Sequence, residues 1–142
     1  MKKIISALTI LIFSIIILST NSFAQPNLDH CSPQILKLGL KVIPVNLDSK
    51  IPGIIESSIY DVVLLKYYFP NQDFSNISDQ LNYIAKKNVN PSIRYKAQLA
   101  SIYLNDTNNI QIIPNTQTYE HDYLFRQIAD QLTNKFLVSS RQ

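Results

Sequence analysis

The chain has 142 residues and a net charge of +3, from 13 basic and 10 acidic side chains. Two of the lysines, Lys2 and Lys3, stand at the extreme N-terminus, so the rest of the chain is close to neutral. Nucleic-acid-binding proteins usually carry a concentrated positive surface, so we expect no nucleic-acid partner.

The N-terminus has the pattern of a bacterial Sec-type signal peptide. The two lysines precede an apolar run from Ile4 to Leu18, and small residues at Ser22 and Ala24 suit cleavage before Gln25. The run is shorter than the roughly 20 residues of a membrane span. We therefore predict a signal peptide over residues 1–24, a periplasmic or secreted protein, and no stable membrane insertion after cleavage. The alternative is an uncleaved N-terminal anchor.

The mature chain has a single cysteine, Cys31, in about 118 residues, a length that suits one domain. A lone cysteine forms no internal disulfide, so a packed core has to supply the stability. Asp29 and His30 precede Cys31, whereas the lipidated cysteine of a lipoprotein directly follows small residues. We expect an inert thiol, with pairing between chains as the alternative, and the oligomeric state stays open.

Residues 25–50 form a lead-in with one candidate element, Ser32–Ile43. Ser32 as cap and Pro33 in the first turn favour a short helix. The alternation in "LKLGLKVI" permits a strand instead. Residues 44–50 are expected to be a connector.

Residues 51–142 are predicted to be a helical domain that begins with a strongly apolar helix. Pro52 suits its first turn, and Pro70 prevents its continuation. Its few polar residues, Ser58 and Asp61 among them, share a narrow arc of the helical wheel. A helix that is apolar on most sides is packed by neighbours on more than one side.

The next predicted helix, within residues 71–88, has one buried and one wet face. Asn76 is expected to cap it. Ile77, Leu81 and Ile84 form its apolar stripe, and two lysines near its end suit the negative helix pole.

A helix over residues 90–104 is predicted with Asn90 as its cap and Pro91 in its first turn. Two apolar faces leave only a thin polar stripe that contains Arg94 and Ser101. Lys96 lies between the apolar faces and is expected to extend its amine outward from a buried stem. Arg94 and Lys96 point in different directions on the helical wheel, which is poor geometry for binding phosphates. We therefore expect Arg94 to bind a carboxylate or a carbonyl at a nearby helix end.

Residues 106–118 show no helical period, and Ile110, Ile112 and Ile113 are expected to pack back onto the body. A last amphipathic helix is predicted after Thr118, with one wet side as in a helix that closes a stack. Its apolar arc comprises Leu124, Phe125, Ile128, Ala129, Leu132 and Phe136.

Residues 51–105 resemble a HEAT-like repeat. The resemblance rests on five positions: Asn90, Pro91, Arg94, Ala97 and Ala100. Pro52 lies 39 residues before Pro91, near the usual repeat length of about 40. The resemblance implies an α-solenoid fragment that works by binding and has no catalytic residues, with other helical-hairpin repeats as alternatives. The fold expected is therefore all-α, with about four or five helices stacked as helical hairpins.

No glycine-rich phosphate loop, HExxH, paired CxxC or GxSxG motif occurs in the chain. We therefore expect no enzyme and no cofactor, but an exported binding or scaffold module. The alternative is a small metal-binding protein or enzyme using His30, Cys31 and His121, which could bind a transition metal if the chain termini met.

Three aromatic residues in a row, Tyr67, Tyr68 and Phe69, end the first apolar helix of the domain. Tyrosines at helix ends commonly pack the ring and leave the hydroxyl in water. Alternatively, some of the chain's tyrosines line a groove for an extended peptide or a glycan, since tyrosine is favoured at binding surfaces. The partner expected is another protein or an extended peptide. Tyr67, Tyr68 and Phe69 are the candidate binding surface of this sequence.

Overall fold

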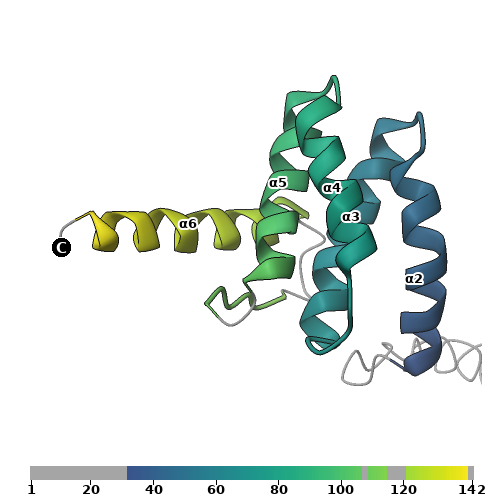
Figure 1. Cartoon of the computed structure of the whole chain (residues 1–142), viewed down its shortest axis with the longest axis horizontal. Coiled ribbons are helices and arrows are strands. Elements are labelled where there is room, and N and C mark those ends of the chain that lie inside the picture. Colours follow the sequence, from purple (N-terminus) through teal and green to yellow (C-terminus); the bar gives the residue numbers. More distant parts are fainter. Residues whose placement is uncertain (1–31, 107–108, 115–120, 141–142) are drawn as a thin grey trace, which may run out of the picture. The chain divides into compact units, whose positions relative to one another are not determined.

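The computed structural model describes residues 32–106, 109–114 and 121–140, and this part of the chain contains five helices and no strand (Figure 1). The predicted signal peptide and residues 25–31 lie outside it. The helices are α2 (Pro33–Leu47), α3 (Pro52–Tyr68), α4 (Ser75–Lys87), α5 (Pro91–Asn105) and α6 (His121–Ser139). The all-α prediction is thereby confirmed.

Helix α2 is longer than the sequence pattern predicted. The connector expected from Pro44 was wrong, and so was the strand alternative, because the helix continues through Pro44 to Leu47. A proline removes one helical hydrogen bond, but Ile43 and Leu47, on either side of it, are buried in the core. The carbonyl of Pro44 also accepts a hydrogen bond of 2.8 Å from Nε2 of Gln80 on α4. Tertiary packing therefore carries the helix past its local breaker.

A glycine permits the close approach of α2 to α3. A Cβ atom at Gly39 would lie 2.5 Å from Cδ1 of Leu65. Since real Cβ atoms essentially never come closer than about 3 Å to a neighbour, a larger residue would require the Leu65 side chain or the helix itself to shift. Gly39 is thus a packing residue.

The helices pack as two sequence-adjacent pairs, α2 with α3 and α4 with α5 (Figure 1). Helix α3 also contacts α5, α2 contacts α4, and α6 contacts α5. Two neighbours, α2 and α5, thus pack against α3, where Ile59, Val62 and Val63 are fully buried. The prediction that this helix is packed on more than one side is confirmed.

The starts of α4 and α5 differ in how well local sequence predicts them. Asn90 caps α5 as expected, since its side chain accepts hydrogen bonds from the amides of Ser92 and Ile93. The cap predicted at Asn76 was wrong, because α4 already begins at Ser75. Asp73 accepts a hydrogen bond of 2.9 Å from the Ser75 amide, so an upstream carboxylate fulfils the role assigned to Asn76.

One member of the polar stripe of α5, Ser101, is buried against α4. Ser101 is only 2% exposed, which contradicts its predicted place on an exposed stripe. Its hydroxyl donates to Oδ1 of Asn82 on α4 at 2.8 Å and lies 3.5 Å from the hydroxyl of Ser78. Asn105 completes the cluster by donating to Ser78 at 3.2 Å. Ser101 therefore pairs with polar residues of α4, because buried polar groups need hydrogen-bond partners.

Helix α6 is buried only along its first turns. Leu124, Phe125 and Ile128 are at most 3% exposed, as predicted. Phe136 was expected on the same buried arc, but it is 73% exposed. Phe136 does lie on the same side of the helical wheel as the buried residues. However, α6 crosses α5, and its last turns extend past the side of that helix (Figure 1). Thr118, after which this helix was predicted to begin, lies outside the described residues.

The stretch before α6 is extended, and two of its three isoleucines pack as predicted. Ile110 and Ile112 are 3% and 4% exposed, whereas Ile113 is 71% exposed. Alternate residues of an extended chain point to opposite sides, and the side chain before Pro114 leaves the core.

Among the described residues, no helix combines the length and hydropathy that a membrane span needs.

Candidate binding pocket

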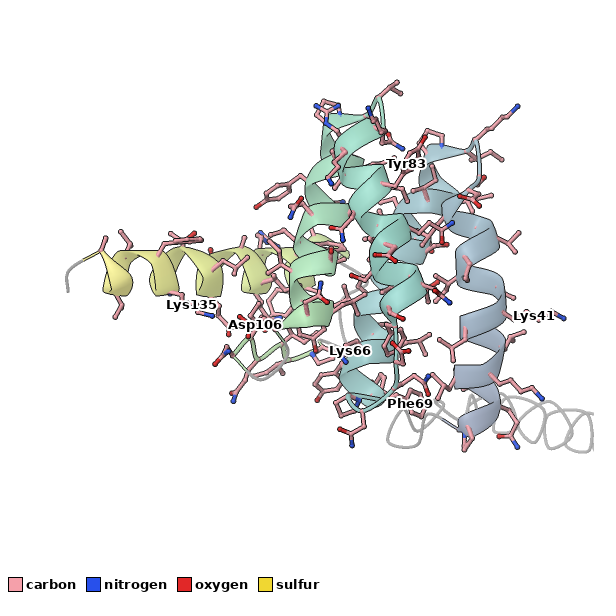
Figure 2. All side chains as sticks on the ribbon, viewed as in Figure 1. Lys41, Lys66, Phe69, Tyr83, Asp106 and Lys135 are labelled. Carbon is pink, nitrogen blue, oxygen red and sulfur yellow. The ribbon has the colours of Figure 1, made fainter. Side chains whose placement is uncertain are left out.

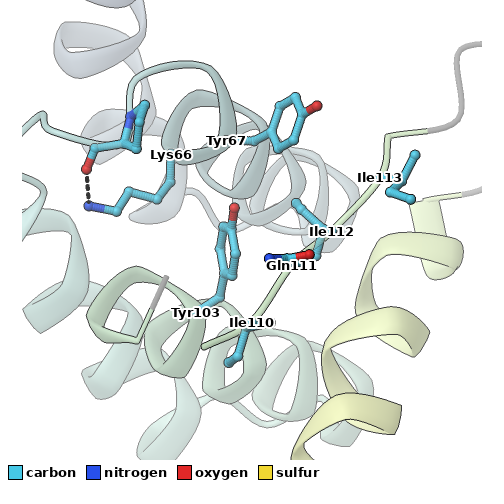
Figure 3. Close-up of a pocket in the computed structure, with 8 residues that line it drawn as sticks. Lys66, Tyr67, Tyr103, Ile110, Gln111, Ile112 and Ile113 are labelled. Carbon is cyan, nitrogen blue, oxygen red and sulfur yellow. Dashed lines mark hydrogen bonds between the residues drawn. The ribbon is translucent and has the colours of Figure 1, made fainter. Parts of the chain in front are cut away.

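A pocket of about 320 Å³ lies between the end of α3, the C-terminal half of α5 and the extended stretch before α6 (Figure 3). It is open to solvent, and most of its walls are aromatic or aliphatic. Its lining residues are Lys66, Tyr67, Pro70, Tyr103, Ile110, Gln111, Ile112 and Ile113. The pocket thus unites residues that are more than 40 positions apart in the sequence.

Two tyrosines form the aromatic part of the pocket. Tyr67 is 41% exposed, whereas Tyr103 is only 3% exposed, and the hydroxyl of Tyr103 points toward the Tyr67 side (Figure 3). Burial, with a smaller contribution from nearby Tyr67, raises the pKa of Tyr103 to about 12. The Tyr103 hydroxyl therefore stays protonated at neutral pH and can donate or accept a hydrogen bond.

The lysine of the pocket contributes its aliphatic stem. Lys66 is 9% exposed, and its amine donates to the carbonyl of Pro70 at 2.8 Å (Figure 3). The same amine lies 5.5 Å from the centre of the Phe74 ring, within the range of a cation–π contact. Lys66 therefore holds the α3–α4 turn together, and its amine is engaged there.

Two glutamines of α6 hold the extended wall of the pocket. Gln131 accepts from the Gln111 amide and donates to the Gln111 carbonyl. Gln127 does the same for Ile113, at 2.9 and 3.1 Å. Positions i and i+4 of a helix are about 6 Å apart along its axis, close to the roughly 6.6 Å between residues i and i+2 of an extended chain. Gln127 and Gln131 therefore supply the hydrogen bonds that a neighbouring strand would otherwise make to this stretch.

The predicted binding surface is divided among different environments. Tyr67 reaches the pocket. The Tyr68 ring meets the Tyr67 ring edge-on, with centroids 5.0 Å apart and an interplanar angle of 81°. Phe69 is half-buried against the hydrophobic core. Tyr103 belongs to the pocket but was not among the predicted binding residues, because no local signal marks a buried tyrosine as a pocket residue.

A second polar cluster joins three helices around Lys96. The prediction that this amine extends into water was wrong, because Lys96 is 8% exposed and pairs with Glu56 of α3 and Asp122 of α6. Its amine also lies 5.7 Å from the centre of the Phe125 ring. Helix α6 covers the place where the amine would have met solvent. The cluster is a structural tie between α3, α5 and α6.

The two cations of α5 are both engaged inside the fold. Arg94 donates to the carbonyls of Asn88 and Val89, at 2.9 and 3.3 Å, where α4 ends. This confirms the carbonyl partner predicted for Arg94. Phosphate binding needs several aligned and available cations, and α5 presents none with Arg94 and Lys96 held in this way.

The alternative metal site falls on His30, Cys31 and the side chain of His121, which lie outside the described residues. Within the described part of the chain, no group of three or more histidine, cysteine, aspartate or glutamate side chains is arranged to hold a metal ion.

No protein-family model, no characterised protein and no solved structure matches this chain significantly.

Proposed function

We propose that this chain is an exported, non-enzymatic module that binds a segment of another protein, or an extended peptide, in the pocket between Tyr67 and Tyr103. The observation that carries the proposal is an open, largely apolar pocket of about 320 Å³ with two tyrosine rings in its wall. Pockets of a few hundred Å³ lined by apolar and aromatic side chains are typical of binding sites.

The chemistry of the lining favours binding over catalysis. Its members are lysine, tyrosine, proline, glutamine and isoleucine, of which lysine and tyrosine can serve as a nucleophile or a general base. The raised pKa of Tyr103 keeps its hydroxyl protonated at neutral pH. The amine of Lys66 is already bound to a carbonyl. What the pocket offers is apolar contact, aromatic faces and the Tyr103 hydroxyl, which suit a single apolar or aromatic side chain of a partner.

The extended wall supports a peptide as the partner. Gln111 is exposed and Ile113 is 71% exposed at the rim of the pocket. An extended segment lying along this rim would place alternate side chains toward the pocket. Peptide-binding proteins combine side-chain pockets with an extended track in this way.

The scaffold role rests on the HEAT-like resemblance, which we retain as a proposal. The cap at Asn90, the first-turn Pro91 and the contacts of Arg94 with the preceding turn are compatible with it. So is the pairing of α2 with α3 and of α4 with α5. A short α-solenoid fragment would present the pocket on a firm support.

Export is proposed from the N-terminal sequence. Mass measurement of the protein recovered from the periplasm or medium should give a chain that starts at Gln25. Recovery of the intact chain from Met1 in membranes would contradict export by cleavage.

The binding proposal is tested by selecting peptides from a displayed random library on the purified protein. Tyr67→Ser should lower the affinity for the selected peptides at least tenfold, because it removes an aromatic side chain from the wall of the pocket. Tyr95→Ser is the matched control, since Tyr95 is 56% exposed on α5 and does not line the pocket. Equal losses in the two variants, or no enriched peptide, would refute the pocket as the binding site.

A further inference from the structure

Helix α2 has a second apolar face that no described residue covers. One face points inward, with Ile43 and Leu47 buried in the core. The other comprises Ile35, Leu38, Val42 and Val45, which are 50%, 62%, 39% and 71% exposed. Their spacing of three, four and three residues places them on one side of the helix. We call these four residues the outer stripe of α2.

Positive charge accompanies this stripe. Lys37 and Lys41 are exposed, and Lys41 extends away from the other helices (Figure 2). Residues 33–47 contain no aspartate or glutamate. The wheel places Lys41 directly beside the outer stripe and Lys37 next to Lys41. This side of α2 is therefore both apolar and positively charged.

We propose that the outer stripe of α2 docks on an anionic lipid surface. Helices that lie in a membrane interface bury an apolar face near the acyl chains while lysines reach the headgroups. Each lysine near an anionic surface contributes about 1 kcal/mol of attraction. The docking is peripheral, because a helix of 15 residues is shorter than the roughly 20 residues of a membrane span and lies along the surface.

A second copy of the chain fits the stripe less well. The outer stripe is centred near residue 40, so an antiparallel pair would join Ile35 to Val45 and Leu38 to Val42 of the other copy. Lys41 would then lie beside the two-fold axis, close to its own counterpart, with no carboxylate on either α2 to balance the charges. The stripe also spans only about 15 Å of a helix about 10 Å wide. It therefore covers roughly 150 Å², far less than the roughly 800 Å² per partner of a stable interface.

This inference is independent of the proposed function. No residue of α2 lines the pocket between Tyr67 and Tyr103. A protein docked through α2 would therefore keep that pocket available. The two proposals can fail separately, because one is measured with vesicles and the other with peptides.

The experiment is sedimentation of the exported protein, as purified from cells, with vesicles of phosphatidylcholine with and without phosphatidylglycerol. We expect binding to the anionic vesicles only, and weaker binding at high salt. The double variant Lys37→Gln, Lys41→Gln should lose about thirtyfold in affinity, at about 1 kcal/mol per lysine. Leu38→Glu with Val45→Glu should abolish binding, because both carboxylates would enter the interface.

Val89→Glu is the matched control, since Val89 is 94% exposed in the turn between α4 and α5. It should leave vesicle binding unchanged, and circular dichroism should show the same helix content in every variant. Binding that survives the α2 variants, absence of binding to anionic vesicles, or a dimer that Val45→Glu dissociates would each overturn the proposal.

Discussion

Removing the charge of Lys96 should destabilise the protein only moderately, because its two partners keep access to water. The side chains of Glu56 and Asp122 are 35% and 65% exposed, so neither becomes a stranded buried charge, which would cost about 3–5 kcal/mol. What is lost is two partly exposed ion pairs, each about 0–1 kcal/mol, and the contact with the Phe125 ring, about 0.5–1 kcal/mol. Lys96→Met should therefore lower the free energy of unfolding by about 1–2 kcal/mol.

Lys96→Ala separates the charge from the buried stem. It also removes three buried methylene groups, each about 0.8 kcal/mol, so it should cost about 2 kcal/mol more than Lys96→Met. Urea denaturation followed by circular dichroism measures both variants. Lys135→Met is the control, because Lys135 is an exposed lysine paired with Asp106 (Figure 2), and it should cost less than about 1 kcal/mol.

The pH dependence follows from the pKa of Lys96. Burial by itself lowers this pKa, but the hydrogen bonds and charges of Asp122 and Glu56 together raise it above its ordinary value of 10.5. The stabilisation is therefore complete below about pH 10.5 and is lost as the pH rises through the folded-state pKa. A cost of more than about 4 kcal/mol for Lys96→Met would mean that the carboxylates are stranded after all. Equal costs of Lys96→Met and Lys96→Ala would mean that the buried stem contributes nothing, and either result refutes this reasoning.

Three further predictions concern other polar contacts. Ser101→Ala should cost about 1–3 kcal/mol in urea denaturation, because Asn82 loses a buried donor; a neutral effect would show that the α4–α5 cluster contributes nothing. The double variant Gln127→Ala, Gln131→Ala should speed hydrogen exchange at the two main-chain amides that these glutamines bind, and unchanged exchange would mean that the extended wall is held by its isoleucines alone. Titration of tyrosine absorbance should show a last ionisation near pH 12 that Tyr103→Phe removes, with this residue's contribution to stability lost between about pH 10 and 12; full ionisation by pH 11 would contradict its burial.

Several helix ends were predictable from the sequence because their signals are local. Proline has a fixed φ and no amide hydrogen, so Pro52, Pro70 and Pro91 indicated where helices begin or stop, whatever surrounds them. The cap at Asn90 is equally local, since its side chain bonds amides two and three residues away. Local signals failed at Pro44, where packing of the neighbouring residues outweighed the one hydrogen bond that proline removes.

The composition and periodicity of the sequence determined by themselves that the protein is helical and which residues share a helix face. They could not determine which faces become covered, because a wheel angle contains no information about the neighbouring helix. That is why Ser101 and Lys96 proved buried and Phe136 exposed. The pocket likewise required the fold, since Tyr67, Tyr103 and residues 110–113 meet only when α3, α5 and the extended stretch pack together. Local chemistry sets the helices, and tertiary packing decides which of their surfaces meet another part of the chain and which face solvent.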